Sequence, residues 1–355
     1  MIQVGLFLPF KSDHWHSIER FAGLIQTKTP TMNSNIHIQL IRPDPWWENW
    51  GAGIARRGIY TFSAAFEKFD VYHIADQSYS HILQFLPRKK VLITCHDLEF
   101  WRKRDSKNMW IRRWMATSLL NAGHVSTPTR IIQKELGLLA HEMQINFPNS
   151  TVIPNSCGDE FQKAVETDHL LAKWNPEKRP LLLNLANTAW PRKNFSFLID
   201  LLKELKSQIP NILLIQVGPR WSEDHKNKIA QHGLVHHIKH FENLSASDVV
   251  EVYQAADLYL HPSTYEGFGY PLLETVACHT PFLASKIDVF SELLPDHRGL
   301  INLDLSTWTE KIKNLLVDSK LRNALLVEQT RILSGFSWKT QIQSYVKIYE
   351  TVAKN

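Results

Sequence analysis

The chain has little cysteine, and the cysteines that it has are far apart. Among 355 residues only Cys95, Cys157 and Cys278 are cysteines, and no two of them have the close spacing of a metal-binding pair. A sparse, odd number excludes a disulfide framework and fits a reducing compartment. No apolar run approaches the roughly 20 residues needed to span a bilayer. The N-terminal run MIQVGLFLPF lacks a basic start and a cleavage site, so it predicts a buried strand rather than a signal peptide.

Glycine is also scarce, with 14 residues in the whole chain. Internal repeats and low-complexity tracts are absent, which excludes solenoids. No Asp-x-Asp signature appears at the end of a predicted strand. The formal net charge of +5 allows an anionic partner without identifying one. No nucleic-acid recognition module is visible, so no nucleic-acid partner is expected.

Short apolar runs alternate with amphipathic stretches along the whole chain. The predicted strands are 2–8, 36–41, 70–75, 90–95, 122–126, 151–154, 180–186, 211–217, 237–241, 257–261 and 281–285. The predicted helices include 107–121, 129–140, 194–207, 247–256, 271–279 and 307–318. Several strands are unbroken apolar runs, which is typical of parallel strands covered on both faces. The alternation predicts an α/β fold with doubly wound parallel sheets.

The alternation pauses between residues 155 and 179, in a polar and charged segment. A fresh strand is predicted directly after it, so this segment predicts a domain boundary. Each side then has the size of one Rossmann-like unit. The tail after residue 335 predicts a final amphipathic helix, with the serine before Trp338 as its cap.

Two glutamates in the stretch HPSTYEGFGYPLLE, residues 261–274, flank a glycine-containing turn before a predicted helix. Free backbone N–H groups at a helix start attract anions, and Gly267 and Gly269 let a bulky anion approach the backbone. The carboxylates of Glu266 and Glu274 only accept hydrogen bonds, so their natural ligands are hydroxyls. A nucleotide sugar, with a diphosphate between two sugars, has this distribution of groups. Glu274 alone is better explained by the helix dipole, but the whole constellation is not.

Two more places follow predicted strands, where open α/β sheets bind their ligands. In LLLNLANTAWPRKN, Arg192 and Lys193 precede a helix. They predict a diphosphate site that stabilises the charge of the departing group, with a solvated basic pair as the alternative. In KVLITCHDLEFW, His96 follows an apolar strand. It predicts either contact with a transferred group, or a proton shuttle, or a buried structural pair with Asp97.

Together these segments resemble the retaining family 4 glycosyltransferases. The similarity is carried by PRKN, ADLYLHPSTYEGFGYPLLETVACHTPFLAS and VIPNS, with weaker support from CHD and the terminal FSW…Y helix. It covers most of residues 150–352, and residues 1–150 loosely. The resemblance implies the GT-B fold, in which two facing Rossmann-like domains with parallel sheets enclose a cleft. It implies an acceptor domain over 1–155, to which the terminal helix 337–355 crosses back, and a nucleotide-sugar donor domain over 156–336.

The resemblance also implies a role for each matching residue. Glu266 would hold hydroxyls of the donor sugar, Glu274 would bind the ribose, and Arg192 and Lys193 would hold the diphosphate. His96 would approach the sugar from the first domain. The remaining donor contacts would come from the glycine-containing turn and from the loop after HIKHF, through Gly267, Phe268, Gly269, Tyr270, Asn243 and Leu244. No metal and no cofactor is expected, because GT-B transferases usually bind the diphosphate without a required metal.

The expected function is transfer of a hexose from a nucleotide diphosphate sugar to a hydroxyl acceptor, with retention of configuration. The acceptor is expected to be a saccharide or a lipid-linked saccharide in cell-envelope polysaccharide or lipopolysaccharide assembly. Several departures from the family keep two alternatives open, a GT-B nucleotide-sugar epimerase and a non-catalytic nucleotide-sugar-binding partner. His279 and Ser156 stand where the family usually has glycine, LANTAW lacks a glycine, and no glycine-rich loop follows the first strand.

Two tryptophan-rich segments lie in the first half of the chain. Residues 100–120 hold six basic residues and three tryptophans. They predict either contact with an anionic membrane surface or a solvated helix whose tryptophans enter the core. Residues 42–53, RPDPWWENWGAG, predict either an acceptor loop or local packing. The expected location is cytoplasmic, with possible peripheral association at the inner face of the membrane.

Overall fold

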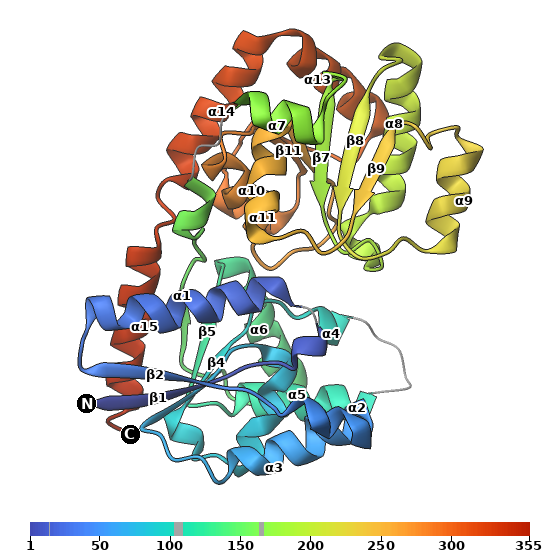
Figure 1. Ribbon diagram of the computed structural model, residues 1–355. Helices are drawn as coiled ribbons and strands as arrows, with labels where there is room; N and C mark the ends of the chain where they lie inside the picture. Colours follow the sequence, from blue (N-terminus) through green and yellow to red (C-terminus); the bar gives the residue numbers. More distant parts are fainter. Residues whose placement is uncertain (14, 103–108, 163–166) are drawn as a thin grey trace. The chain divides into compact units, whose positions relative to one another are not determined.

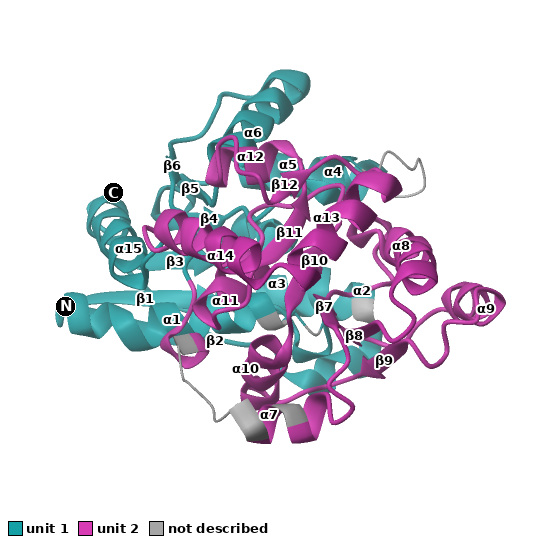
Figure 2. Ribbon diagram, turned by 90° about the horizontal axis from the view of Figure 1, so that it is seen from above, with its two compact units in different colours: residues 1–156, 336–355 teal, residues 157–335 magenta. Residues whose placement is uncertain are grey.

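The computed structural model describes residues 1–13, 15–102, 109–162 and 167–355, and the chain divides into two compact units (Figures 1 and 2). Unit 1 comprises Met1–Ser156 and Phe336–Asn355, and unit 2 comprises Cys157–Gly335. In each unit, helices cover a six-stranded sheet. All of the strand pairs are parallel within the described residues, as the unbroken apolar runs predict.

The sheet of unit 1 has the strand order β2-β1-β3-β4-β5-β6. Its first five strands therefore have the flavodoxin-like order 2-1-3-4-5, with a sixth strand added at the edge. The strands of unit 1 are β1 (Ile2–Phe7), β2 (Ile36–Ile41), β3 (Val71–Ile74), β4 (Val91–Thr94), β5 (His124–Thr127) and β6 (Ser150–Val152).

The longer helices of unit 1 are joined by several short helical turns. The α-helices are α1 (His16–Met32), α2 (Ala52–Ile54), α3 (Tyr60–Ala64), α4 (Glu99–Arg102), α5 (Met109–Leu120), α6 (Arg130–Met143) and α15 (Trp338–Val352). The 3-10 turns are η1 (Lys11–Asp13), η2 (Pro45–Trp50), η4 (Gln77–Phe85) and η5 (Arg88–Lys90), and Ala55–Ile59 is a π-turn between α2 and α3.

The C-terminal helix α15 is part of unit 1, although the chain passes through unit 2 before reaching it. Its side chains Ile342, Tyr345 and Tyr349 are buried in the core beside β1, β3 and β4. The imidazole of His73 lies 2.8 Å from the Tyr349 hydroxyl and 2.7 Å from the Thr94 hydroxyl. These polar contacts join α15 to the centre of the sheet.

The sheet of unit 2 has the strand order β12-β11-β10-β7-β8-β9. Numbered within the unit and read from its other edge, this is 3-2-1-4-5-6, the order of the Rossmann fold. The strands of unit 2 are β7 (Leu181–Leu185), β8 (Leu213–Val217), β9 (Ile238–Phe241), β10 (Leu258–His261), β11 (Phe282–Ser285) and β12 (Leu300–Ile301).

Helices of unit 2 bury their apolar faces on the sheet, with Trp308 of α13 fully buried in the core. The helices are α7 (Thr167–Trp174), α8 (Phe195–Gln208), α9 (Glu223–Gln231), α10 (Ala246–Ala255), α11 (Tyr270–Ala277), α12 (Asp288–Leu293), α13 (Leu305–Val317) and α14 (Ser319–Leu333). The 3-10 turns of unit 2 are η7 (Asp159–Gln162) and η8 (Pro191–Lys193).

Each predicted strand is confirmed to within two residues at either end, because buried parallel strands are read directly from apolar runs. The predicted helices are confirmed to within three residues, apart from positions 107 and 108, which lie outside the described residues. The sequence-based list did not include the helices α1, α2, α3, α4, α7, α9, α12 and α14 or the two-residue strand β12. Helix α1 follows a run of polar residues and contains Pro30, which obscured its periodicity.

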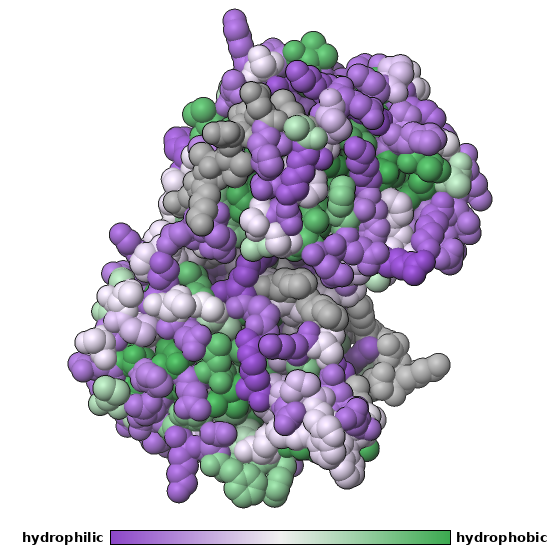
Figure 3. All heavy atoms as spheres, viewed as in Figure 1, coloured by the Kyte–Doolittle hydropathy of each residue, from purple (hydrophilic) through white to green (hydrophobic). Residues whose placement is uncertain are grey.

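The basic and tryptophan-rich segment 100–120 is described in part, because residues 103–108 lie outside the described residues. Trp110 of α5 is 66% exposed, whereas the ring of Trp114 lies 5.5 Å from that of His81. The segment therefore combines a surface tryptophan with one that packs inward. Hydrophobic side chains also reach the surface of unit 1 over α3 (Figure 3). Within the described ranges, no helix is both long enough and apolar enough to cross a membrane.

Candidate functional site

The predicted polar residues of unit 2 follow strands on both sides of the point where the strand order reverses. From the central strand β7 the chain continues to β8 and β9 on one side, and later to β10, β11 and β12 on the other. Arg192 and Lys193 lie in η8 after β7, and Glu266 lies in the loop after β10. Because β7 and β10 are parallel neighbours, both loops leave the same sheet edge. Open α/β sheets bind their ligands at this switch point.

Hydrogen bonds hold these loops together. The backbone N–H of Thr264 donates to the carbonyl oxygen of Arg192 over 2.8 Å, which joins the loop after β10 to η8. The side-chain amide of Asn194 donates to the carbonyl oxygen of Pro262 over 3.2 Å. Ser285, the last residue of β11, donates its hydroxyl to the carbonyl oxygen of Ser263. Three neighbouring strands therefore support one rigid group of loops.

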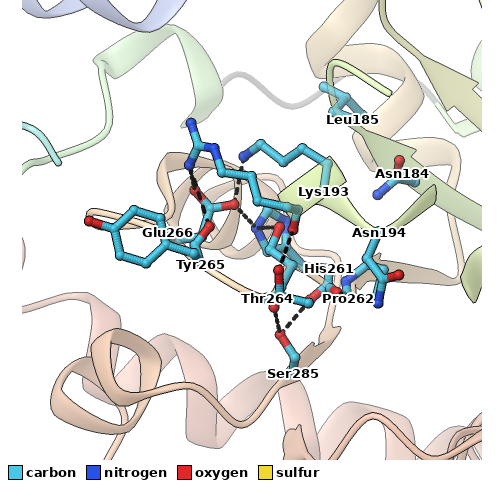
Figure 4. A network of polar contacts seen from close by, with 12 residues as sticks. Asn184, Leu185, Lys193, Asn194, His261, Pro262, Thr264, Tyr265, Glu266 and Ser285 are labelled. Carbon is cyan, nitrogen blue, oxygen red and sulfur yellow. Dashed lines mark hydrogen bonds and ion pairs between the residues drawn. The ribbon is translucent and has the colours of Figure 1, made fainter. Parts of the chain in front are cut away.

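Arg192, Lys193 and Glu266 form a compact charged cluster on these loops, and Figure 4 shows Lys193 and Glu266 pointing toward each other. Lys193 Nζ lies 2.5 Å from Glu266 Oε1, and Arg192 Nη1 lies 3.3 Å from Glu266 Oε2. The guanidinium of Arg192 also lies over the ring of Trp190, 4.7 Å from its centre. All three charged side chains are largely buried, with 7% of Glu266, 12% of Arg192 and 13% of Lys193 exposed.

The charge of Glu266 depends on its neighbours. Burial on its own raises the pKa of a carboxyl group, because it removes water from the charged form. Here Lys193, His261 and Arg192 outweigh that effect and hold the pKa of Glu266 well below its usual range. The arrangement therefore contains a stable carboxylate and two cations, which suits a ligand that carries both hydroxyls and an anionic group.

His261, the last residue of β10, is a site residue that the sequence analysis did not identify. Its Nε2 lies 3.0 Å from Glu266 Oε1, and its Nδ1 lies 2.9 Å from the hydroxyl of Tyr259. Burial lowers the pKa of His261, which favours the neutral imidazole. The alternation of side chains along a strand places Tyr259 and His261 on one face of the run LYLH, and that signal was available in the sequence.

Glu274 lies in α11, and only 2% of it is exposed. The hydroxyl of Tyr253 donates to Glu274 Oε2 over 3.0 Å. The rings of Tyr253 and Tyr259 lie 5.6 Å apart, and Tyr259 in turn contacts His261. The structure therefore brings Glu274 to the same group of side chains as Glu266, through two buried tyrosines.

The predicted glycine-containing turn, from Gly267 to Tyr270, connects Glu266 to α11. Gly269 precedes the helix with a φ of 100°, which is a left-handed conformation that favours glycine. A Cβ atom at this position would lie 2.6 Å from the ring of Phe290. Phe268 is buried, and its ring lies 5.9 Å from the ring of Tyr270. This sequence folds as a tight turn because glycine occupies the position that no other residue fits.

The other two predicted donor contacts, Asn243 and Leu244, lie after β9. They leave the same sheet edge as η8, but β9 is separated from β7 by β8. Asn243 has a φ of 53°, and Ser245, directly after Leu244, caps the start of α10 in a capping box with Asp248. Asn243 and Leu244 thus follow the carboxyl end of the outermost strand, β9, and lie directly before the start of α10.

His96 lies in unit 1, after β4. Its Nε2 lies 3.0 Å from the carbonyl oxygen of Ala75, and its backbone N–H donates to Gln77 Oε1 over 2.8 Å. Burial lowers the pKa of His96 to about 4, so the imidazole is neutral at pH 7. These contacts with Ala75 and Gln77, which follow β3, hold the imidazole of His96 in place. The other predicted catalytic residues belong to unit 2.

His279 stands where the resembled family usually has glycine, and this difference affects the backbone after α11. His279 follows α11 with a φ of 61°, the left-handed conformation that favours glycine. Histidine is among the residues that are enriched in this region, so the chain keeps the turn without glycine.

Within the described ranges, no group of three or more His, Cys, Asp or Glu side chains has an arrangement that could hold a metal ion.

Comparisons with known proteins find relatives of this chain among the glycosyltransferases. Residues 167–330 match the family model described as glycosyl transferases group 1. The chain is 25% identical over 229 residues to the O-antigen chain mannosyltransferase RfbU of Salmonella typhimurium, covering 63% of this chain and 60% of that protein. It is 28% identical over 167 residues to the phosphatidyl-myo-inositol mannosyltransferase of Mycobacterium leprae, covering 46% of this chain and 44% of that protein. The alignments thus span about half of these relatives' lengths.

The fold is also similar to that of solved structures. The crystal structure of Anabaena Alr3699/HepE in complex with UDP and glucose has a TM-score of 0.77 with this chain. The alignment covers 99% of this chain and 100% of that one, at 17% sequence identity. The likeness includes residues of both units, and the predicted GT-B fold is confirmed.

Proposed function

We propose that this chain, which belongs through residues 167–330 to the glycosyl transferases of group 1, moves a hexose from a nucleotide diphosphate sugar to a hydroxyl acceptor. The observation that carries the proposal is the cluster of Arg192, Lys193 and Glu266 at the switch point of unit 2. Two mannosyltransferases among the relatives and a structural neighbour in complex with UDP and glucose support this class of substrate.

In this proposal each site residue has a distinct role. Arg192 and Lys193 bind the diphosphate and stabilise the charge that grows on it as it leaves. Glu266 accepts hydrogen bonds from hydroxyls of the hexose, and Glu274 from those of the ribose. Retention follows if the acceptor oxygen bonds to the anomeric carbon on the face from which the phosphate oxygen departs. That phosphate oxygen then takes the acceptor proton, so the step needs no enzymic nucleophile.

The glycine-containing turn and the loop after β9 would complete the donor site. Backbone N–H groups from Gly267 to Tyr270 line the phosphates and the sugar, and Asn243 and Leu244 lie near the base. The two cations already supply positive charge for the diphosphate, so we propose transfer that needs no metal and no cofactor. His96 would contact the transferred sugar as a neutral imidazole from unit 1.

The acceptor is proposed to be a saccharide or lipid-linked saccharide of a cell-envelope polysaccharide or lipopolysaccharide. Trp46 and Trp50 support a sugar-binding surface on unit 1, since they are 60% and 57% exposed and their rings lie 5.9 Å apart. Aromatic faces of this kind pack against apolar faces of sugar rings. We also propose a cytoplasmic protein that contacts the membrane surface through residues 100–120, where Trp110 is exposed.

The test begins with a thermal-shift screen of uridine and guanosine diphosphates, which identifies the donor base. Transfer to a saccharide acceptor is then measured for the wild type, Arg192→Ala and Glu266→Ala. Each variant is expected to lose roughly 10²–10³-fold in rate, because each removes a preorganised charged contact. Lys226→Ala is the matched control, because Lys226 pairs with Glu223 on the exposed surface of the same unit. Addition of EDTA is expected to leave the rate unchanged.

The same assay separates the alternatives. An epimerase would convert the nucleotide sugar to its epimer without any acceptor, which product analysis reveals directly. A non-catalytic partner would bind the nucleotide without turnover of any donor and acceptor pair. Transfer at the wild-type rate by both Arg192→Ala and Glu266→Ala would falsify the assignment of the site.

A further inference from the structure

The two cations of the candidate site contact a carboxylate of the same chain. Lys193 Nζ and Arg192 Nη1 lie 2.5 Å and 3.3 Å from oxygens of Glu266. A diphosphate that binds these cations competes with that carboxylate, because both are anions that accept hydrogen bonds. Donor binding therefore draws positive charge away from Glu266.

Glu266 is costly to leave without compensation, because its side chain is almost fully buried. Its low pKa rests, against the effect of burial, on Lys193, His261 and Arg192. Of these three residues, His261 alone is not a proposed ligand of the diphosphate. When the two cations turn to the diphosphate, the proton affinity of Glu266 rises and His261 becomes its remaining partner.

The proton affinity of His261 changes in the same direction. Burial lowers the pKa of this imidazole, and the charges of Lys193 and Arg192 lower it further, whereas Glu266 raises it. A diphosphate that neutralises Lys193 and Arg192 removes the part of the decrease in the pKa of His261 that these two cations cause. Both members of the His261–Glu266 hydrogen bond thus bind a proton more readily after the donor has bound.

Tyr259 can satisfy His261 in either protonation state. Its hydroxyl lies 2.9 Å from His261 Nδ1 and 3.3 Å from the carbonyl oxygen of Leu185. Next to a neutral imidazole, Tyr259 donates to Nδ1. Next to an imidazolium, Nδ1 donates to the hydroxyl oxygen, and Tyr259 donates to Leu185 instead. Neither state leaves a buried hydrogen-bond donor without an acceptor. The gain of a proton therefore avoids the free-energy cost of an unsatisfied buried donor.

The remaining neighbours of the imidazole carry no charge. The ring of Phe290 in α12 lies 5.4 Å away, and the Ser263 hydroxyl lies 3.2 Å from Nε2. The hydroxyl oxygen of Ser285 in β11 lies 3.5 Å from the carbonyl oxygen of His261. Among the described residues, the charged groups that act on the imidazole are therefore Glu266, Lys193 and Arg192.

We propose that His261 is the positioning residue that keeps Glu266 in place during donor binding, because a proton on the His261–Glu266 pair replaces the charge that Arg192 and Lys193 direct to the diphosphate. The proton comes from solvent and is released when the nucleoside diphosphate leaves. The proposal rests on the nucleotide-sugar function proposed above. It adds that donor binding is coupled to proton uptake.

The test is calorimetric titration with UDP or GDP, whichever the thermal-shift screen identifies, in Pipes, Hepes and Tris at one pH. The dependence of the heat on the ionisation enthalpy of the buffer counts the protons taken up per nucleotide bound. His261→Gln keeps a side-chain N–H donor for Glu266 but cannot gain a proton. The wild type is expected to take up more protons than this variant, by a difference that approaches one. Lys226→Ala is expected to match the wild type.

A second measurement uses the wild type alone, so it does not depend on the folding of any variant. The Kd for the nucleoside diphosphate is expected to fall as the pH falls, by up to about tenfold per pH unit if one proton is taken up. Nucleotide binding with equal proton uptake in the wild type and His261→Gln overturns the role of His261 and leaves the proposed function standing. So does a Kd that does not vary with pH. No binding of any nucleotide overturns the proposed function, and the role of His261 with it.

Discussion

Gly269 and His279 lie at the two ends of α11, and both have left-handed backbone conformations, with φ of 100° and 61°. Their side-chain requirements differ. A Cβ atom at Gly269 would collide with Phe290, and the value of φ adds strain for any side chain. His279 is exposed and has a φ that histidine tolerates, so that turn accepts a substitution for glycine.

Gly269→Ala is therefore expected to destabilise the protein by about 1–3 kcal/mol and to lower donor turnover, because it disturbs the turn between Glu266 and α11. The matched control is Gly23→Ala, since Gly23 lies inside α1 and a Cβ atom there meets nothing within 4 Å. The control is expected to be neutral or to stabilise by up to about 1 kcal/mol. Chemical denaturation measures both changes, and equal effects of the two substitutions would contradict this account.

At the scale of elements, the contact of α15 with the first sheet depends on a buried polar network. His73 of β3 lies against Tyr349 of α15 and Thr94 of β4. Burial lowers the pKa of His73 to about 3, and it lowers the pKa values of His81 and His96 to about 4. In the unfolded chain these groups titrate near 6.5. Below that pH the unfolded chain binds protons that the folded chain does not.

The free energy of unfolding is consequently expected to fall as the pH falls from about 6.5 to about 4, by about 1.4 kcal/mol per pH unit for each such histidine. Asp76 partly offsets this loss, because burial raises its pKa to about 7 and the folded chain then binds the extra proton. Denaturation at a series of pH values should give a shallower dependence for His73→Gln and a steeper one for Asp76→Asn. Equal slopes in all three proteins would refute the assignment of these protonation states.

At the scale of the whole molecule, the chain forms two units with separate hydrophobic cores, and α15 returns to the first. Among the described residues, the large aromatic side chains that are exposed belong to unit 1. On unit 1, Phe62 and Phe66 are exposed beside each other, with ring centres 5.1 Å apart, and Trp110 is exposed on α5. An exposed apolar surface of this kind, together with basic residues, suits an anionic membrane.

Sedimentation with phosphatidylglycerol vesicles tests this membrane contact. The wild type is expected to bind and to dissociate as salt is raised, because screening weakens the attraction of basic residues to the lipid. Trp110→Ala is expected to weaken binding severalfold, since it removes an interfacial anchor. Val317→Ser serves as the control, because Val317 is an exposed apolar side chain of unit 2. If the two variants bind equally, the surface at Trp110 is not the point of contact.

The parts of the fold that were predictable are those in which local chemistry decides. The buried strand LLLNL and the run LYLH are apolar enough to be identified alone, and Gly269 and Pro271 indicate the start of α11. Helix α14 was missed because its apolar residues form a weak stripe, and its position depends on contact with α11 and α13. The two strand orders were not predictable either, because strand neighbours are chosen by long-range packing.

For the candidate site, the sequence by itself determined the chemistry: two glutamates, two cations and a glycine-containing turn, each placed after a strand. Only the tertiary structure decided which of them meet. Side chains 73 positions apart in the chain, such as Lys193 and Glu266, come into contact because β7 and β10 are neighbours in the sheet. The same packing buries His261 against Glu266 and brings Lys193 and Arg192 to the carboxylate. Burial and these neighbouring charges together determine the protonation of both groups, and no single stretch of the sequence contains this combination.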